Sequence, residues 1–212
     1  MTAASAQPGL SLYRDPGDRG FTVADLHALP EDGPRYELID GSIIVSPSAT
    51  AGHNSVARWI ANAVEDANPG DEYMVSTDQS TSIDDHNEPR PDIVVARTEH
   101  FEQTPFPIGD TLLVAEVISP TSVLRDTEIK RALYARAGVP SYWIVVPHAE
   151  KGEIALAELV LDGDAYRYMQ HYTTGVFQTD RPWPLTVDLP ALSARRERLL
   201  SRGARIAPEL PD

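Results

Sequence analysis

The sequence contains no cysteine. This absence excludes disulfides, thiolate nucleophiles and cysteine-type zinc sites, and leaves carboxylates, histidines, lysines and hydroxyls to carry any chemistry. Basic residues are also few, because 18 Lys and Arg stand against 32 Asp and Glu, a net charge of −14. An average field of that sign repels nucleic acid, so a nuclease would need a local basic patch or a bound metal to reverse it.

Long apolar runs are missing as well. No run approaches the roughly 20 residues that cross a bilayer, and the first residues lack the basic start and apolar stretch of a signal peptide. We therefore expect a cytoplasmic protein without membrane contact. The hydrophobic fraction of 42% is that of a globular chain and not of a disordered one, so we expect the protein to fold.

Composition along the chain suggests three parts. Residues 1–20 hold Pro, Gly and Ser without periodicity and are predicted to form a flexible tail. Residues 21–190 are predicted to form one domain, and residues 191–212 an arginine-rich helix or tail. The five arginines of that last part are either a solvated helical face or a contact for nucleic acid or a partner, and they are Arg195, Arg196, Arg198, Arg202 and Arg205.

Hydrophobic periodicity predicts the elements of the domain. A helix is expected where apolar residues recur every three or four positions, and a strand where they alternate or run together. The pattern predicts helices at 22–29, 53–67 and 123–137, strands at 72–83, 91–97, 111–119 and 140–147, an N-terminal hairpin at 35–46 around Asp40-Gly41, and a C-terminal hairpin turning near Gly163. This order predicts an α/β fold in which helices flank a mixed β-sheet.

Two acids stand in apolar strands. Asp92 opens the run "IVVA", and Glu116 lies inside "LLVAEVI". Because side chains alternate along a strand, Asp92 should share a face with Val94, and Glu116 with Leu112 and Val114. An ionised carboxylate on such a face is costly unless it is paired, hydrogen-bonded or bound to a cation. The sequence leaves open an ion pair, a strand end that reaches water, and a metal site of the oxygen type that Mg²⁺ prefers.

The segments around these acids resemble a known family. "RPD" precedes one strand, "VAEVIS" lies on the next, and "DTEIKRALYARAGVPSYWIV" follows, with "YELIDGSIIVSPSATAGHNSVA" upstream. Over about residues 35–147 this order resembles the Uma-two family of restriction-endonuclease-like proteins, within the PD-(D/E)XK nuclease superfamily. The resemblance implies a restriction-endonuclease-like core and a metal-dependent endonuclease that hydrolyses phosphodiester bonds in DNA. It also implies a homodimer.

The resemblance further implies a metal centre. Asp92, Glu116 and the backbone carbonyl of Val117 would hold Mg²⁺ or Mn²⁺, with Glu37 as a further ligand, and the ion would activate a water for attack on the phosphodiester. His53 would contact the scissile phosphate or a metal-bound water. Without the resemblance, Glu37 equally suits a half-exposed strand position, and His53 a hydrogen-bonding residue at a helix end.

One position departs from the superfamily pattern. The lysine expected two residues after the glutamate is replaced by Ile118. The resemblance suggests a migrated lysine, and Lys130 fits, one helical turn after Asp126 and one before Tyr134. It would orient the attacking water or stabilise charge on the phosphate. The alternative is a surface lysine paired with Asp126 or Glu128.

Two other functions stay open. The chain could be a catalytically inactive protein that keeps the nuclease fold as a binding or regulatory module, which Ile118 and the net charge of −14 both favour. It could also be a phosphodiesterase acting on RNA or on small nucleotides, for which net charge matters less than the local charge of a metal.

Overall fold

A six-stranded sheet lies at the centre of the molecule. The computed structural model describes residues 20–30, 34–46, 49–119, 123–149 and 152–206, so the predicted tail lies, apart from Gly20, outside the described residues. In spatial order the strands are β10 (Ala165–Thr173), β9 (Ala155–Asp162), β8 (Ser141–Val146), β7 (Thr111–Val117), β5 (Ile93–Arg97) and β3 (Tyr73–Thr77). All neighbours are antiparallel except β7 and β8. The predicted mixed sheet is confirmed.

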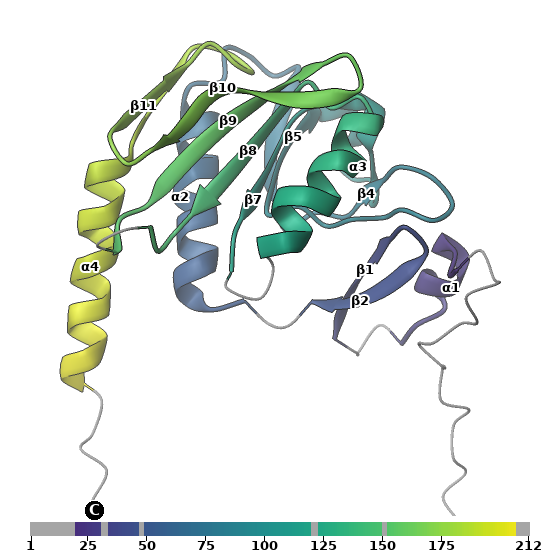
Figure 1. The fold of residues 1–212 in the computed structure, drawn as a ribbon, viewed down its shortest axis with the longest axis horizontal. Helices are drawn as coiled ribbons and strands as arrows, with labels where there is room; N and C mark the ends of the chain where they lie inside the picture. Colours follow the sequence, from purple (N-terminus) through teal and green to yellow (C-terminus); the bar gives the residue numbers. More distant parts are fainter. Residues whose placement is uncertain (1–19, 31–33, 47–48, 120–122, 150–151, 207–212) are drawn as a thin grey trace, which may run out of the picture.

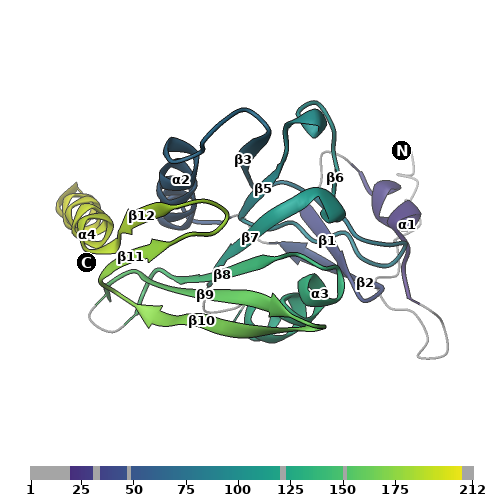
Figure 2. The ribbon, with the colours of Figure 1, turned by 90° about the horizontal axis from the view of Figure 1, so that it is seen from above.

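Helices cover both faces of this sheet. A parallel pair needs a crossover, and the chain between β7 and β8 supplies it with η3 (Arg125–Ile129), a π-helical turn, and α3 (Lys130–Arg136). The longer helix α2 (Ala51–Asp66) lies on the opposite face, as Figures 1 and 2 show from two directions. The predicted α/β layering is therefore confirmed.

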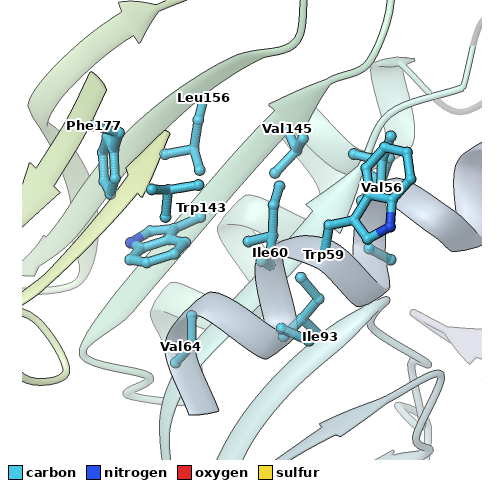
Figure 3. Packing of buried hydrophobic residues seen from close by; sticks show 14 of the residues in the cluster. Val56, Trp59, Ile60, Val64, Ile93, Trp143, Val145, Leu156 and Phe177 are labelled. Carbon is cyan, nitrogen blue, oxygen red and sulfur yellow. The ribbon is translucent and has the colours of Figure 1, made fainter. Parts of the chain in front are cut away.

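The core between α2 and the sheet explains why this helix forms. Val56, Ile60 and Val64 recur every four residues and are fully buried, so they make one apolar stripe. They pack against strand residues that include Ile93 and Trp143 (Figure 3). Full burial of each such side chain contributes about 1.5–3 kcal/mol. This stripe fixes the angle at which α2, and with it the first turn of the helix, meets the sheet.

One bulge changes a predicted side-chain direction. The register between β5 and β7 shifts between Val95 and Ala96. Leu112, close to the shift, packs against the cluster on the α2 side, whereas Val114 packs on the α3 side. The face predicted for Leu112 is wrong, because a bulge adds a residue to one strand and interrupts the alternation. The face predicted for Val114 is confirmed.

The N-terminal hairpin forms as predicted. Strand β1 (Arg35–Ile39) pairs antiparallel with β2 (Ser42–Ser46). The turn residues Asp40 and Gly41 have φ angles of 45° and 71°, the positive values that a two-residue hairpin turn requires. The short helix α1 (Val23–His27) precedes the hairpin and is shorter than the predicted 22–29.

The hairpin is a separate small sheet that docks beside the central one. Three backbone hydrogen bonds join it to the loop before β5, from Leu38 N to Glu88 O at 3.1 Å, from Glu88 N to Leu38 O at 2.8 Å and from Gly41 N to His86 O at 3.0 Å. Phe21 and Leu26 pack on the buried side chain of Leu38. This docking brings the neighbouring residue Glu37 towards α3.

The strand predicted at 72–83 is wrong in extent. β3 ends at Thr77, because Asp78 adopts a positive φ of 56° that extended backbone does not allow. The chain then forms β4 (Thr81–Ser82), which pairs with β6 (Phe106–Pro107) outside the central sheet.

The C-terminal part contains a second hairpin in addition to the predicted one. The hairpin of β9 and β10 turns at Gly163, which has a φ of 68°. A second hairpin follows, of β11 (Val176–Thr179) and β12 (Leu185–Asp188), and was not predicted. Its strands have four residues each, too few for alternation to be decisive.

The arginine-rich segment forms helix α4 (Leu189–Ile206), and part of it docks on the domain. Arg196 is 8% exposed and donates hydrogen bonds to His148 and to the carbonyl of Gly152, while the guanidinium of Arg195 lies 4.7 Å from the ring centre of Trp59. The other arginines of α4 whose side chains are described are exposed. Among the described helices, none is long and apolar enough to cross a membrane.

Candidate active site

The two strand acids meet at one end of the central sheet. The antiparallel register pairs Ile93 with Ala115, so Asp92, one residue earlier, lies beside Glu116. The ladder ends there, and the carboxylate of Asp92 continues it by accepting the backbone N–H of Val117, with Oδ2 to N at 2.7 Å. The strand-end position explains how an acid is tolerated at residue 92.

Glu116 is stabilised by two donors from α3. It is 3% exposed, and its Oε1 accepts Lys130 Nζ at 2.9 Å and the hydroxyl of Tyr134 at 3.0 Å. The two donors are one helical turn apart and therefore project from the same side of α3. Within the described ranges, both hydrogen bonds fall on Oε1, which leaves Oε2 without a donor.

Lys130 joins two carboxylates inside the protein. Its Nζ also lies 2.9 Å from Oε2 of Glu37, and the residue is only 1% exposed. The alternative of a surface lysine is therefore wrong. Glu37 is likewise buried, at 5% exposure, so its predicted half-exposed position is wrong too. We call Glu37, Glu116 and Lys130 the buried triad.

The buried triad has two acids for one base, and the pKa values of Glu116 and Lys130 are both raised. Burial raises the pKa of the Glu116 carboxyl well above its ordinary value, against the opposing effect of Lys130. Burial disfavours the charged form of Lys130, yet the carboxylates of Glu116 and Glu37 outweigh it and raise the pKa of its ammonium. The raised pKa favours the protonated form of Lys130 near neutral pH, which suits a cation better than a base.

The π-helical turn η3 helps to aim Lys130 inward. A π turn inserts one residue relative to an α-helix and rotates everything after it, and such turns are frequent at functional sites. The carbonyl of Asp126, inside the turn, accepts the hydroxyl of Tyr142 at 2.7 Å. Asp126 is 2% exposed, and its charge adds to the effects that raise the pKa of Glu116 and Lys130. The sequence pattern did not reveal this further buried acid beside the site.

His53 supports the other strand acid. The side chain of Thr50 caps α2 by accepting the backbone N–H of His53, and the imidazole Nε2 of His53 lies 2.9 Å from Oδ1 of Asp92. This hydrogen bond raises the pKa of His53, with burial acting in the opposite direction. His53 is thus held against Asp92 as a cation or as a hydrogen-bond donor.

His53→Gln is expected to change how stability depends on pH. Since the folded-state pKa of His53 is raised above 6.5, its ion pair contributes fully below pH 6.5 and the contribution is lost as pH rises through the folded-state value. Urea unfolding in EDTA should show a larger difference between wild type and variant at pH 6 than at pH 8.5. A difference that grows with pH would contradict this. His171→Gln is the control, because that ring stacks on Tyr168 without a carboxylate partner among the described residues.

The carboxylate oxygens of this site are the type of ligand that a hard divalent ion prefers. Asp92 and Glu116 are neighbouring carboxylates, each oxygen can accept twice, and Mg²⁺ takes one or two carboxylates with water and phosphate completing its shell. In the described ranges, three ligand-type side chains come within 4.8 Å of one another at one place, Glu99, His100 and Asp110. That group follows the far end of β5, and hydrogen bonds to Gln103 and Asp110 already occupy both nitrogens of His100.

The residues predicted for the site form two groups of contacts, which lie side by side because Asp92 and Glu116 occupy neighbouring positions of adjacent strands. Asp92 touches Val117 and His53, while Glu116 and Glu37 share Lys130. For Val117 the contact is through its N–H, and the predicted use of its carbonyl stays a prediction. The catalytic and metal-binding roles of all these residues likewise stay predictions, and Tyr134 and Asp126 are the residues that the sequence did not single out.

The chain is similar to known proteins in fold and in sequence. A solved structure described as "a putative nuclease belonging to DUF820 from Anabaena variabilis ATCC 29413" is similar in fold, with a TM-score of 0.61 at 15% identity, over 83% of this chain and 99% of that one. A search of curated proteins finds no match. Residues 23–196 match the family model Uma2, described as "Putative restriction endonuclease". The chain therefore belongs to the Uma2 family of restriction-endonuclease-like proteins.

Proposed function

We propose that the protein is a metal-dependent endonuclease that hydrolyses phosphodiester bonds in DNA. Its family and the nuclease fold of its structural relative support a nuclease. The observation that carries the proposal is the pairing of Asp92 with Glu116 at the sheet end, where Lys130 and Tyr134 occupy one oxygen of Glu116 and leave the other for an ion.

Asp92, Glu116 and the carbonyl of Val117 would hold Mg²⁺ or Mn²⁺, with Glu37 as a further ligand. When bound, the ion would polarise the phosphate and lower the pKa of a water. Because the buried acid Glu116 binds protons tightly, ion and proton compete for it, so metal affinity should rise with pH.

The remaining site residues act through charge and orientation. Lys130 stays protonated, so in this proposal it stabilises the anionic form of Glu116 and contributes positive charge next to the phosphate. His53 holds Asp92 in place through Nε2, and its other ring nitrogen is the atom that would contact the phosphate or a water. Ile118 is buried at 7% exposure and packs on the α3 side, a position that suits an apolar residue.

The DNA substrate and the homodimer are parts of the proposal that rest on the family, and the cytoplasmic location is a part that the composition of the sequence suggests. With a net charge of −14 the chain repels DNA on average, and a divalent ion at Asp92 and Glu116 would reverse the field locally. A dimer would supply two sites, as cutting both strands of a duplex requires.

The test is nicking of supercoiled plasmid by the full-length protein at pH 8. Nicking is expected with Mg²⁺ or Mn²⁺ and none with EDTA. Parallel reactions with single-stranded RNA and with dinucleotides separate a DNA enzyme from a phosphodiesterase on other substrates. Cleavage that persists in EDTA would overturn metal dependence, and cleavage restricted to RNA or dinucleotides would overturn the DNA assignment.

A non-catalytic nuclease-fold module is the second candidate. The observation that favours it is that Lys130, at 2.9 Å, already neutralises Glu116 without any metal. In that case isothermal titration calorimetry would detect no uptake of Mn²⁺, and Asp92→Asn would leave every binding property of the protein unchanged.

A further inference from the structure

Three buried tyrosines stack beside the site on the α3 side of the sheet. The ring centres of Tyr134 and Tyr142 are 5.5 Å apart, and those of Tyr142 and Tyr166 are also 5.5 Å apart. All three are at most 5% exposed. The rings pack in one cluster with Val114 and Ile144 of the central strands, so their positions are fixed by packing on several sides.

The three hydroxyl groups have different acceptors. Tyr134 donates to Oε1 of Glu116 at 3.0 Å. The other two donate to backbone carbonyls, at 2.7 Å for Tyr142 and 2.8 Å for Tyr166. Of this stack, Tyr134 is thus the member whose hydroxyl reaches a carboxylate of the site.

A single lysine would hold the Glu116 carboxylate loosely. An ammonium is a point charge on a flexible stem with three rotatable donors, so it tolerates rotation of the carboxylate and can move from one oxygen to the other. A phenol on a packed ring has one donor in one place. Because Tyr134 and Lys130 converge on Oε1 from adjacent turns of α3, rotating the carboxylate would break two hydrogen bonds at once.

We propose that Tyr134 is a positioning residue, whose hydroxyl acts with Lys130 to hold Glu116 by Oε1 and so presents Oε2 to the divalent ion. The inference rests on the proposed function, since it concerns the same ion. It adds a residue to that site and explains why Oε1 of Glu116 accepts two hydrogen bonds. Groups that orient a metal ligand in this way affect metal affinity although they do not touch the metal.

The test compares Tyr134→Phe with Tyr166→Phe. Each variant removes one hydroxyl from the same stack and keeps the ring, so both should lose a similar amount of thermal stability when no metal is present. Isothermal titration calorimetry with Mn²⁺ alone, on EDTA-stripped full-length protein at pH 8, should give a Kd that is roughly 10- to 100-fold weaker for Tyr134→Phe. The Kd of Tyr166→Phe should equal that of the wild type. Plasmid nicking by Tyr134→Phe should recover at saturating Mn²⁺.

Each contrary outcome identifies what fails. An unchanged Kd for Tyr134→Phe, or equal weakening in both variants, overturns the positioning role, while wild-type Mn²⁺ uptake and nicking leave the proposed function standing. If the wild type takes up no Mn²⁺, the proposed function fails and the positioning role falls with it.

Discussion

Asp92→Asn and Glu116→Gln should each lower the rate of metal-dependent plasmid nicking by roughly 10³-fold, because several kcal/mol of transition-state stabilisation comes from a catalytic metal and about 1.4 kcal/mol corresponds to a factor of ten. Each substitution keeps the shape of the side chain and removes the charge that would hold the ion. The measurement is the initial rate of nicking at a fixed Mg²⁺ concentration, with Mn²⁺ uptake measured by calorimetry on the same proteins.

The matched control for these variants is Glu158→Gln. Glu158 is another acid of the central sheet, 2% exposed in β9, and it accepts a hydrogen bond from the hydroxyl of Thr179 at 2.8 Å. Its amide variant should nick DNA at the wild-type rate. Nicking that survives both Asp92→Asn and Glu116→Gln would show that the activity comes from elsewhere in the protein or from a contaminant.

Lys130→Met should lower the free energy of unfolding by about 3–5 kcal/mol at pH 8, the usual cost of removing one partner of a buried ion pair. The substitution keeps the apolar stem and leaves Glu37 and Glu116 without their shared cation. The loss should shrink as pH falls towards 5. In the variant the buried carboxyl of Glu116 keeps a raised pKa, so the folded state binds protons more readily than the unfolded state and is relatively stabilised as pH falls.

Urea unfolding in EDTA measures this loss, and Arg136→Met is its control. Arg136 lies on the same helix in an exposed pair with Asp40, at 3.3 Å, where such pairs contribute about 0–1 kcal/mol. The double variant Lys130→Met with Glu116→Gln should recover part of the lost stability. If Lys130→Met costs no more than Arg136→Met, the buried triad does not stabilise the fold in the way that its geometry indicates.

The hairpin at 35–46 and the C-terminal hairpin turning at Gly163 were predictable because local rules decide them. A positive φ is needed at the turn, and glycine or aspartate supplies it. The strand predicted at 72–83 failed for a related reason, since Asp78 at a φ of 56° ends β3, and an aspartate that no glycine follows is a weaker turn signal than Asp40-Gly41. The four-residue strands β11 and β12 were missed because so short a pattern carries little periodic signal.

The site was predictable as a set of residues but not as a set of contacts. Alternation in the strands indicated that Asp92 and Glu116 needed partners, and family resemblance pointed to Lys130 and His53. The partners themselves depend on long-range placement. Lys130 meets Glu37, from a separate small sheet, only because that hairpin docks beside α3, and a docking of this kind leaves no mark on a local pattern.

By itself the sequence determined the order of most elements and the mixed α/β class. It also showed two acids in apolar strands that need a stabilising partner. Only the tertiary structure decided how each acid is stabilised. Asp92 ends a ladder and binds a backbone N–H and His53, while Glu116 meets an ammonium and a phenol that a π-helical turn and a stack of tyrosines hold in place. The reason is physical, because the strength of an ion pair depends on the burial and distance of groups that are far apart along the chain.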